Sequence, residues 1–121
     1  MENFNNKKYN LGERTAKFGE DVIDFLKNLK KDEINKPMIS QTIRCCTSIG
    51  ANYMEADGAE SGKDFKHKIA ICKKESKEAM YWFRMIARNN PENKEECRRL
   101  WQEAHELALI FSSILLPKNK K

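Results

Sequence analysis

The sequence lacks most of the features that mark an enzyme or a metalloprotein. It has 2 histidines and 5 glycines in 121 residues, and it contains neither a phosphate-binding glycine loop nor a dinucleotide-binding fingerprint. The 4 cysteines form no Cys-x-x-Cys pair, and there is no Glu-x-x-His motif of the kind that di-iron bundles use. We therefore expect a protein without catalytic residues, cofactor or metal ion.

An apolar run of membrane length is also missing. The first ten residues are polar and lack the apolar centre of a signal peptide, and no stretch approaches the roughly 20 apolar residues of a membrane span. These absences favour a cytoplasmic protein that does not bind membranes. In that compartment we expect the cysteines to be reduced and to pack as small buried hydrophobes: Cys45, Cys46, Cys72 and Cys97.

What the sequence has in abundance is charge. Charged residues make up 34% of the chain, and the net charge is +5. A basic surface permits association with a polyanion such as nucleic acid, although many basic proteins bind none. Regular apolar faces run through the chain, so its 121 residues predict one folded domain. We expect residues 1–10 and 117–121 to form mobile polar tails.

Apolar residues recur at the three-then-four spacing of a helix face in four successive segments. We expect helices over residues 12–30, from Pro37 to the turn that Gly58 and Gly62 bracket, over 63–88 and over 92–116. No segment alternates as a strand would. The short connections predict an all-α, antiparallel up-down-up-down four-helix bundle.

Residues that favour helix starts precede three of these segments. Residues 32–36 are expected to connect the first two helices, with Pro37 at the first helical position, where its missing N–H costs nothing. Ser61 is predicted to cap the third helix through its hydroxyl. Asn90 is predicted to cap the fourth, with Pro91 at its first position.

A basic stripe runs along the predicted third helix. On a helical wheel of about 100° per residue, seven basic residues and Tyr81 fall within a sector of about 100°, uninterrupted by any acid. The stripe is either a solvated or subunit-facing surface, offset by pairs such as Lys74–Glu78, or a surface that contacts phosphates. The sequence leaves both interpretations open. The residues of the basic stripe are Lys63, Lys66, Lys73, Lys74, Lys77, Arg84 and Arg88.

Three polar residues share one face of the predicted second helix. Ser48 and Asn52 are four residues apart, and Asn52 and Glu55 are three apart. This polar trio is either a binding site or a hydrogen-bonded network that fixes helix packing or a subunit contact. We favour the second interpretation, because buried polar groups more often specify packing than chemistry.

The first and last helices carry more apolar residues than one core stripe needs. Ile23 and Leu26 widen the face of the first helix, and Leu109 and Ile110 lie away from the seam of the fourth. Together they would form a larger exposed apolar patch than a soluble monomer usually tolerates. We therefore expect a homo-oligomer closed into a ring, in which these four residues serve packing or subunit contact.

The middle of the chain resembles a known family in three stretches, residues 44–55, 61–65 and 74–82. The resemblance is to four-helix-bundle proteins encoded by intervening sequences of 23S ribosomal RNA genes. The second helix of that family typically carries a Ser-Ile-x-Ala-Asn-x-x-Glu pattern. Gly50 stands where the family often has proline, and Ala56 where it often has glycine. The residues that match the pattern are Ser48, Ile49, Ala51, Asn52 and Glu55.

This resemblance implies a function that the residues alone do not give. The family is similar to the accessory protein of diversity-generating retroelements, a basic pentameric bundle that binds nucleic acid and a reverse transcriptase. The resemblance thus implies a non-enzymatic homopentamer that binds RNA or DNA, with a reverse transcriptase or another protein as a further partner. The alternative is a structural or protein-interaction oligomer with no nucleic-acid role.

Overall fold

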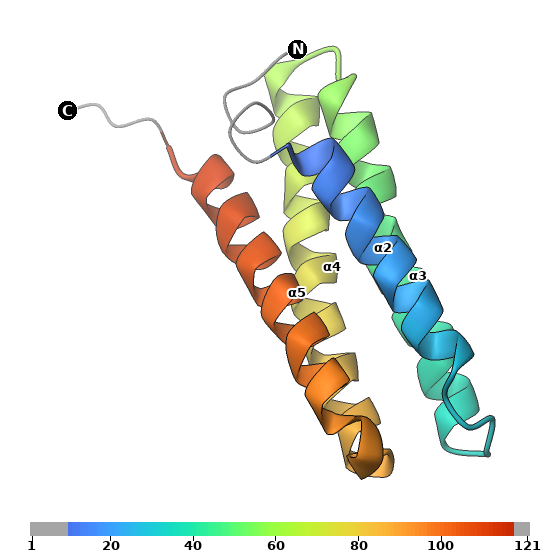
Figure 1. Cartoon of the computed structure of the whole chain (residues 1–121). Helices are drawn as coiled ribbons and strands as arrows, with labels where there is room; N and C mark the ends of the chain where they lie inside the picture. Colours follow the sequence, from blue (N-terminus) through green and yellow to red (C-terminus); the bar gives the residue numbers. More distant parts are fainter. Residues whose placement is uncertain (1–9, 118–121) are drawn as a thin grey trace.

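The computed structural model describes residues 10–117, which fold as four long antiparallel helices (Figure 1). They are α2 (Leu11–Lys27), α3 (Asn35–Asp57), α4 (Gly62–Asn89) and α5 (Lys94–Leu115), with a short 3-10 helix η1 (Pro91–Asn93) before α5. This part of the chain contains no strand, and none of its helices is long and apolar enough to cross a membrane. The predicted all-α bundle is confirmed. The expected tails at 1–9 and 118–121 lie outside the described residues.

The helices do not contact one another equally. α4 packs extensively against both α3 and α5, and α3 also packs against α2. The fourth side of the bundle, between α2 and α5, has the sparsest packing, and the two helices stand well apart in Figure 1. α4 is therefore the central helix of the bundle: α3 and α5 pack against it, and α2 packs against α3.

The core joins all four helices through aromatic and small side chains. Phe83 of α4 meets Phe18 edge-on with ring centroids 6.3 Å apart, and Tyr53 of α3 lies 6.5 Å from Phe111 of α5. Between α2 and α3, a Cβ on Gly50 would lie 3.4 Å from the Thr15 hydroxyl. A methyl group would therefore just make van der Waals contact with Thr15, which shows how closely the two helices approach at Gly50.

Two helix starts show how local sequence sets the boundaries. The Ser61 hydroxyl accepts the backbone N–H of Asp64 at 3.0 Å, which confirms the predicted cap of α4. α3 begins before Pro37, because the Asp32 carboxylate accepts the backbone N–H of Asn35 at 2.7 Å. Residues 32–34 lie in the predicted connection, whereas Asn35 and Lys36 already belong to α3. Pro37 lies in the first turn, where no N–H is needed.

Asn90 occupies the predicted N-cap position and Pro91 the first helical position, but of the short η1 and not of α5, which begins at Lys94. The Asn90 side chain makes no capping bond at the start of η1 and is instead fully buried at the end of the bundle, against Asn35. The two amides exchange two hydrogen bonds of 2.9 Å each. Each also binds a carbonyl oxygen, with Asn90 donating to Ile86 and Asn35 donating to Lys30, both at 2.8 Å. This asparagine pair joins the α2–α3 connection to the end of α4.

Replacing Asn35 with alanine should destabilise the fold by about 1–3 kcal/mol, because the buried amide of Asn90 then loses both hydrogen bonds to Asn35. Urea unfolding followed by circular dichroism measures the change. Ser40→Ala, at an exposed position of the same helix, should stay within about 0.5 kcal/mol of the wild type. Equal midpoints for the two variants would show that the asparagine pair contributes nothing.

Candidate nucleic-acid interface

The basic stripe lies on the face of α4 that turns away from the core. Its residues are exposed except for Lys73, which is half-buried beside the apolar face. The stripe extends from Lys63 in the first turn of α4 to Arg88 in the last. The structure therefore brings the predicted basic residues together on one outer surface.

The charges of the basic stripe are not neutralised by neighbouring acids. Six other lysines and arginines in residues 10–117 pair with carboxylates, whereas none of the stripe's ammonium or guanidinium groups lies within 4.0 Å of one there. The sequence spacing suggested an ion pair between Lys74 and Glu78. Glu78 pairs instead with Arg44 of α3, at 2.9 Å. Trp82 donates its indole N–H to the same carboxylate oxygen at 3.1 Å. Glu78 is thus turned toward α3 and away from the stripe.

An exposed aromatic ring lies within the stripe. Tyr81 is 54% exposed, and its ring meets Trp82 edge-on at a centroid distance of 5.2 Å. Trp82 is in turn held by its bond to Glu78. Tyr81 therefore has a supported position and an accessible ring, which a nucleic-acid base requires of a stacking partner.

The polar trio does not form one network. Asn52 donates to the hydroxyl and to the backbone carbonyl of Ser48, both at 2.9 Å, and both residues are half-buried. Glu55 is exposed and forms a 2.7 Å ion pair with Lys68 of α4, whose pKa it raises by hydrogen bonding. Two separate interactions therefore replace the single network that spacing suggests. The Glu55–Lys68 pair does link α3 to α4.

The four surplus apolar residues do not form one patch either. Leu26 is only 4% exposed and packs in the core of the single chain, so of its two predicted roles the structure shows packing. Ile110 is half-buried and packs against the same core. Ile23 and Leu109 are exposed, on α2 and α5 respectively. Ile23 lines a groove of about 270 Å³ between α2 and α3, together with the exposed Met54.

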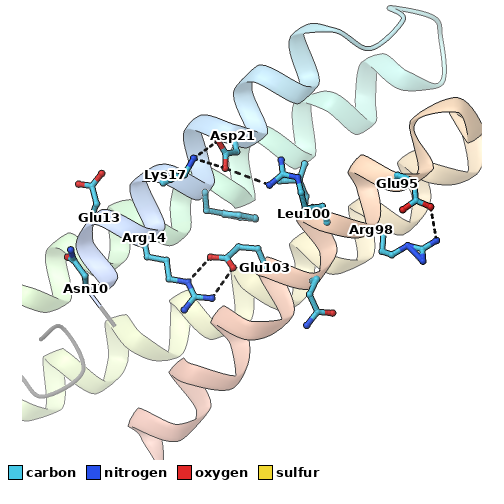
Figure 2. A pocket seen from close by; sticks show the side chains of 12 residues that line it. Asn10, Glu13, Arg14, Lys17, Asp21, Glu95, Arg98, Leu100 and Glu103 are labelled. Atoms are coloured by element: carbon cyan, nitrogen blue, oxygen red, sulfur yellow. Dashed lines mark hydrogen bonds and ion pairs between the residues drawn. The ribbon is translucent and has the colours of Figure 1, made fainter. Parts of the chain in front are cut away.

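A larger groove, of about 740 Å³, lies between α2 and α5 (Figure 2). Arg14 bridges it by pairing with Glu103 at 2.7 Å and with Glu106 at 2.9 Å, which raises the pKa of its guanidinium. Buried Phe18 and Leu100 also line this groove. These ion pairs link two sparsely packed helices. Because the opposite charges in the groove pair with each other, little free charge remains for a ligand. Arg14 and Glu103 lie 89 residues apart in the sequence, so helical periodicity could not predict that they pair.

Asn52→Ala should lower the stability of a single chain by less than about 1 kcal/mol, because the amide bonds only within its own helix and is half-buried. Urea unfolding at several protein concentrations checks this. A larger loss that grows on dilution would mean that Asn52 makes a subunit contact instead. If the variant instead keeps its stability and its oligomer mass but loses ligand binding, Asn52 is a binding residue.

Comparison with known proteins gives one family. The family of the 23S rRNA-intervening sequence protein matches residues 7–113. A solved structure from Bacteroides thetaiotaomicron, described as a protein of unknown function from the S23 ribosomal protein family, is 28% identical. It covers 88% of this chain and 99% of its own, with a TM-score of 0.79. No curated protein matches the sequence.

Proposed function

The chain belongs to the 23S rRNA-intervening sequence protein family, and from its surface we propose that it is a non-enzymatic homo-oligomer that binds nucleic acid through phosphate contacts. The observation that carries this proposal is the basic stripe on α4, whose charges are not paired with carboxylates in residues 10–117. Like charges aligned on one helix face repel one another, and a polyanion relieves that repulsion. Binding releases the counterions of the phosphates, which makes affinity depend steeply on salt.

Tyr81 supports a preference for unpaired bases. Phosphate contacts alone do not distinguish one nucleic acid from another. An exposed aromatic ring between cations adds base stacking, which contributes about 1–3 kcal/mol per base and requires an unstacked strand. We therefore favour single-stranded or looped RNA over duplex DNA as the ligand.

The exposed apolar residues support assembly. Ile23 and Met54 lie at the α2–α3 groove, and Leu109 lies on α5, so these three residues offer two separate apolar surfaces. When one such surface meets the other on the next subunit, the contact is heterologous and can close into a ring. Five subunits are implied by the family resemblance alone. A ring would repeat the basic stripe, so weak phosphate contacts would add through avidity.

Two further features complete the proposal. The four cysteines are buried and unpaired within the described residues, as suits the reducing cytoplasm where we place the protein. By resemblance, a reverse transcriptase or another nucleic-acid-processing protein is a candidate partner. The accessory role would then be to hold the nucleic acid for that partner.

Reversing two charges at exposed positions of the basic stripe, Lys77→Glu and Arg84→Glu, should weaken RNA binding and flatten its salt dependence. Each lost phosphate contact lowers the log–log salt slope by about 0.7 for a single strand. The slope should therefore fall by roughly 1.4 per bound subunit. Fluorescence anisotropy with a labelled single-stranded RNA, titrated at several salt concentrations, measures both quantities.

Lys30→Glu with Lys36→Glu is the matched control for that experiment. It changes the net charge equally, at exposed lysines near the α2–α3 connection. It should keep most of the affinity and slope. If the two double variants lose affinity equally, only net charge matters, and if neither does, the stripe is not the interface.

Met54→Glu and Leu109→Glu should each reduce the oligomer to monomers, because each buries an unpaired charge at one half of the proposed contact. Light scattering at micromolar concentration measures the mass, and circular dichroism confirms that the helices remain. A wild-type protein that is already monomeric would overturn the assembly. An unchanged mass in both variants would overturn this interface.

The alternative is an oligomer that serves structure or protein interaction only. Its support is the same exposed apolar surface, with Met54 68% and Leu109 56% exposed. Binding to the partner would then survive high salt, because apolar contacts do not release counterions. Salt titration of binding therefore separates the two functions.

A further inference from the structure

Three potential metal ligands converge at the interface of α3 and α4. They are the Cys45 thiol and the carboxylates of Glu75 and Glu78, whose ligand atoms all lie within 4.8 Å of one another. Cys45 and Glu75 are buried, and Glu78 is partly exposed. The thiol comes from one helix and the two carboxylates from the other.

Glu75 is the group that points to a ligand. It is only 6% exposed, and its Oε1 atom is buried without a hydrogen-bond partner in the described part of the chain. Burial raises the pKa of this carboxyl, and the neighbouring Glu78 carboxylate raises it further. A buried carboxylate beside a second one is costly unless cations or donors satisfy its oxygens.

Arg44 satisfies only part of this demand. Its guanidinium lies 2.9 Å from Oε2 of Glu78 and 3.7 Å from Oε2 of Glu75, and it is 53% exposed. Trp82 also donates to Oε2 of Glu78. All these contacts use Oε2 atoms, and within residues 10–117 none of them reaches the Oε1 atom of Glu75.

We propose that Cys45, Glu75 and Glu78 form a binding site for a divalent transition-metal ion of the zinc class. One thiolate and two carboxylates suit such an ion better than magnesium or calcium, which prefer oxygen ligands alone. The Cys45 thiol releases its proton to solvent on binding, and the fourth position is open to water. With the Arg44 guanidinium, the charges of the ligands and of a divalent ion sum to zero.

The ion would link α3 to α4 at the middle of the bundle. Sequence spacing could not predict this site, because Cys45 lies 30 or more residues before the two glutamates and no two of the three residues form a known metal motif. The site is independent of the nucleic-acid role, since it requires neither the basic stripe nor assembly.

Cobalt(II) titration of the reduced, chelator-treated protein tests the proposal. Binding at the site should give a thiolate-to-cobalt charge-transfer band that saturates at one ion per chain, and zinc should displace the cobalt. Cys45→Ser should lose the band. Glu75→Gln and Glu78→Gln should keep it but weaken binding by at least about 10-fold, since even outer-shell partners contribute that much.

Cys97→Ser is the matched control, because it removes a buried cysteine of α5 that is outside the cluster. It should bind cobalt as the wild type does. Circular dichroism confirms that each variant is helical, and Glu78→Gln, at a partly exposed position, keeps the test valid if a buried variant unfolds. The absence of a charge-transfer band in the wild type, or equal affinity in the wild type and both glutamine variants, would overturn the proposal.

Discussion

The rest of the structure depends on the burial of α4 between α3 and α5. Both neighbours pack along α4, so its apolar positions, such as Ile69, Phe83 and Ile86, are completely covered. A helix that buries one broad face in this way must present the opposite face to its surroundings. The basic stripe lies on that opposite face. The same packing that stabilises the fold therefore fixes the orientation of the candidate interface.

The packing of α3 on α4 also separates charges of opposite sign. Glu75 and Glu78 turn toward Arg44, at the interface of the two helices, while the lysines and arginines of α4 remain outside. On an isolated α4 those acids would be close enough along the helix to offset nearby lysines, as the spacing of Lys74 and Glu78 suggests. Arg44 removes that offset. Consequently the outer face keeps its positive potential, and the interface concentrates negative charge where we place a cation.

Helical periodicity predicted the four helices and the faces on which they pack. Local chemistry also predicted the Ser61 cap, because its partner is three residues away. Features that depend on a distant partner escaped prediction, as shown by Asn35 with Asn90, 55 residues apart, and by Arg14 with Glu103. Periodicity assigns a residue to a face of its own helix, but not to the helix that covers that face. For this reason spacing could not decide whether Leu26 packs within the chain or contacts another subunit, and the structure buries it within one chain.

The same limit applies to the candidate site. Spacing alone placed the basic stripe on one face of α4, but it could not show that Glu78 is engaged elsewhere, which required the position of α3. The two candidate surfaces occupy separate helices: the stripe lies on α4, and the residues that we propose for assembly, Ile23, Met54 and Leu109, lie on α2, α3 and α5. An assembly through the latter helices leaves the stripe uncovered. In the function that we propose, oligomerisation and phosphate binding would therefore not compete for surface, and a ring would gain avidity without burying the basic stripe.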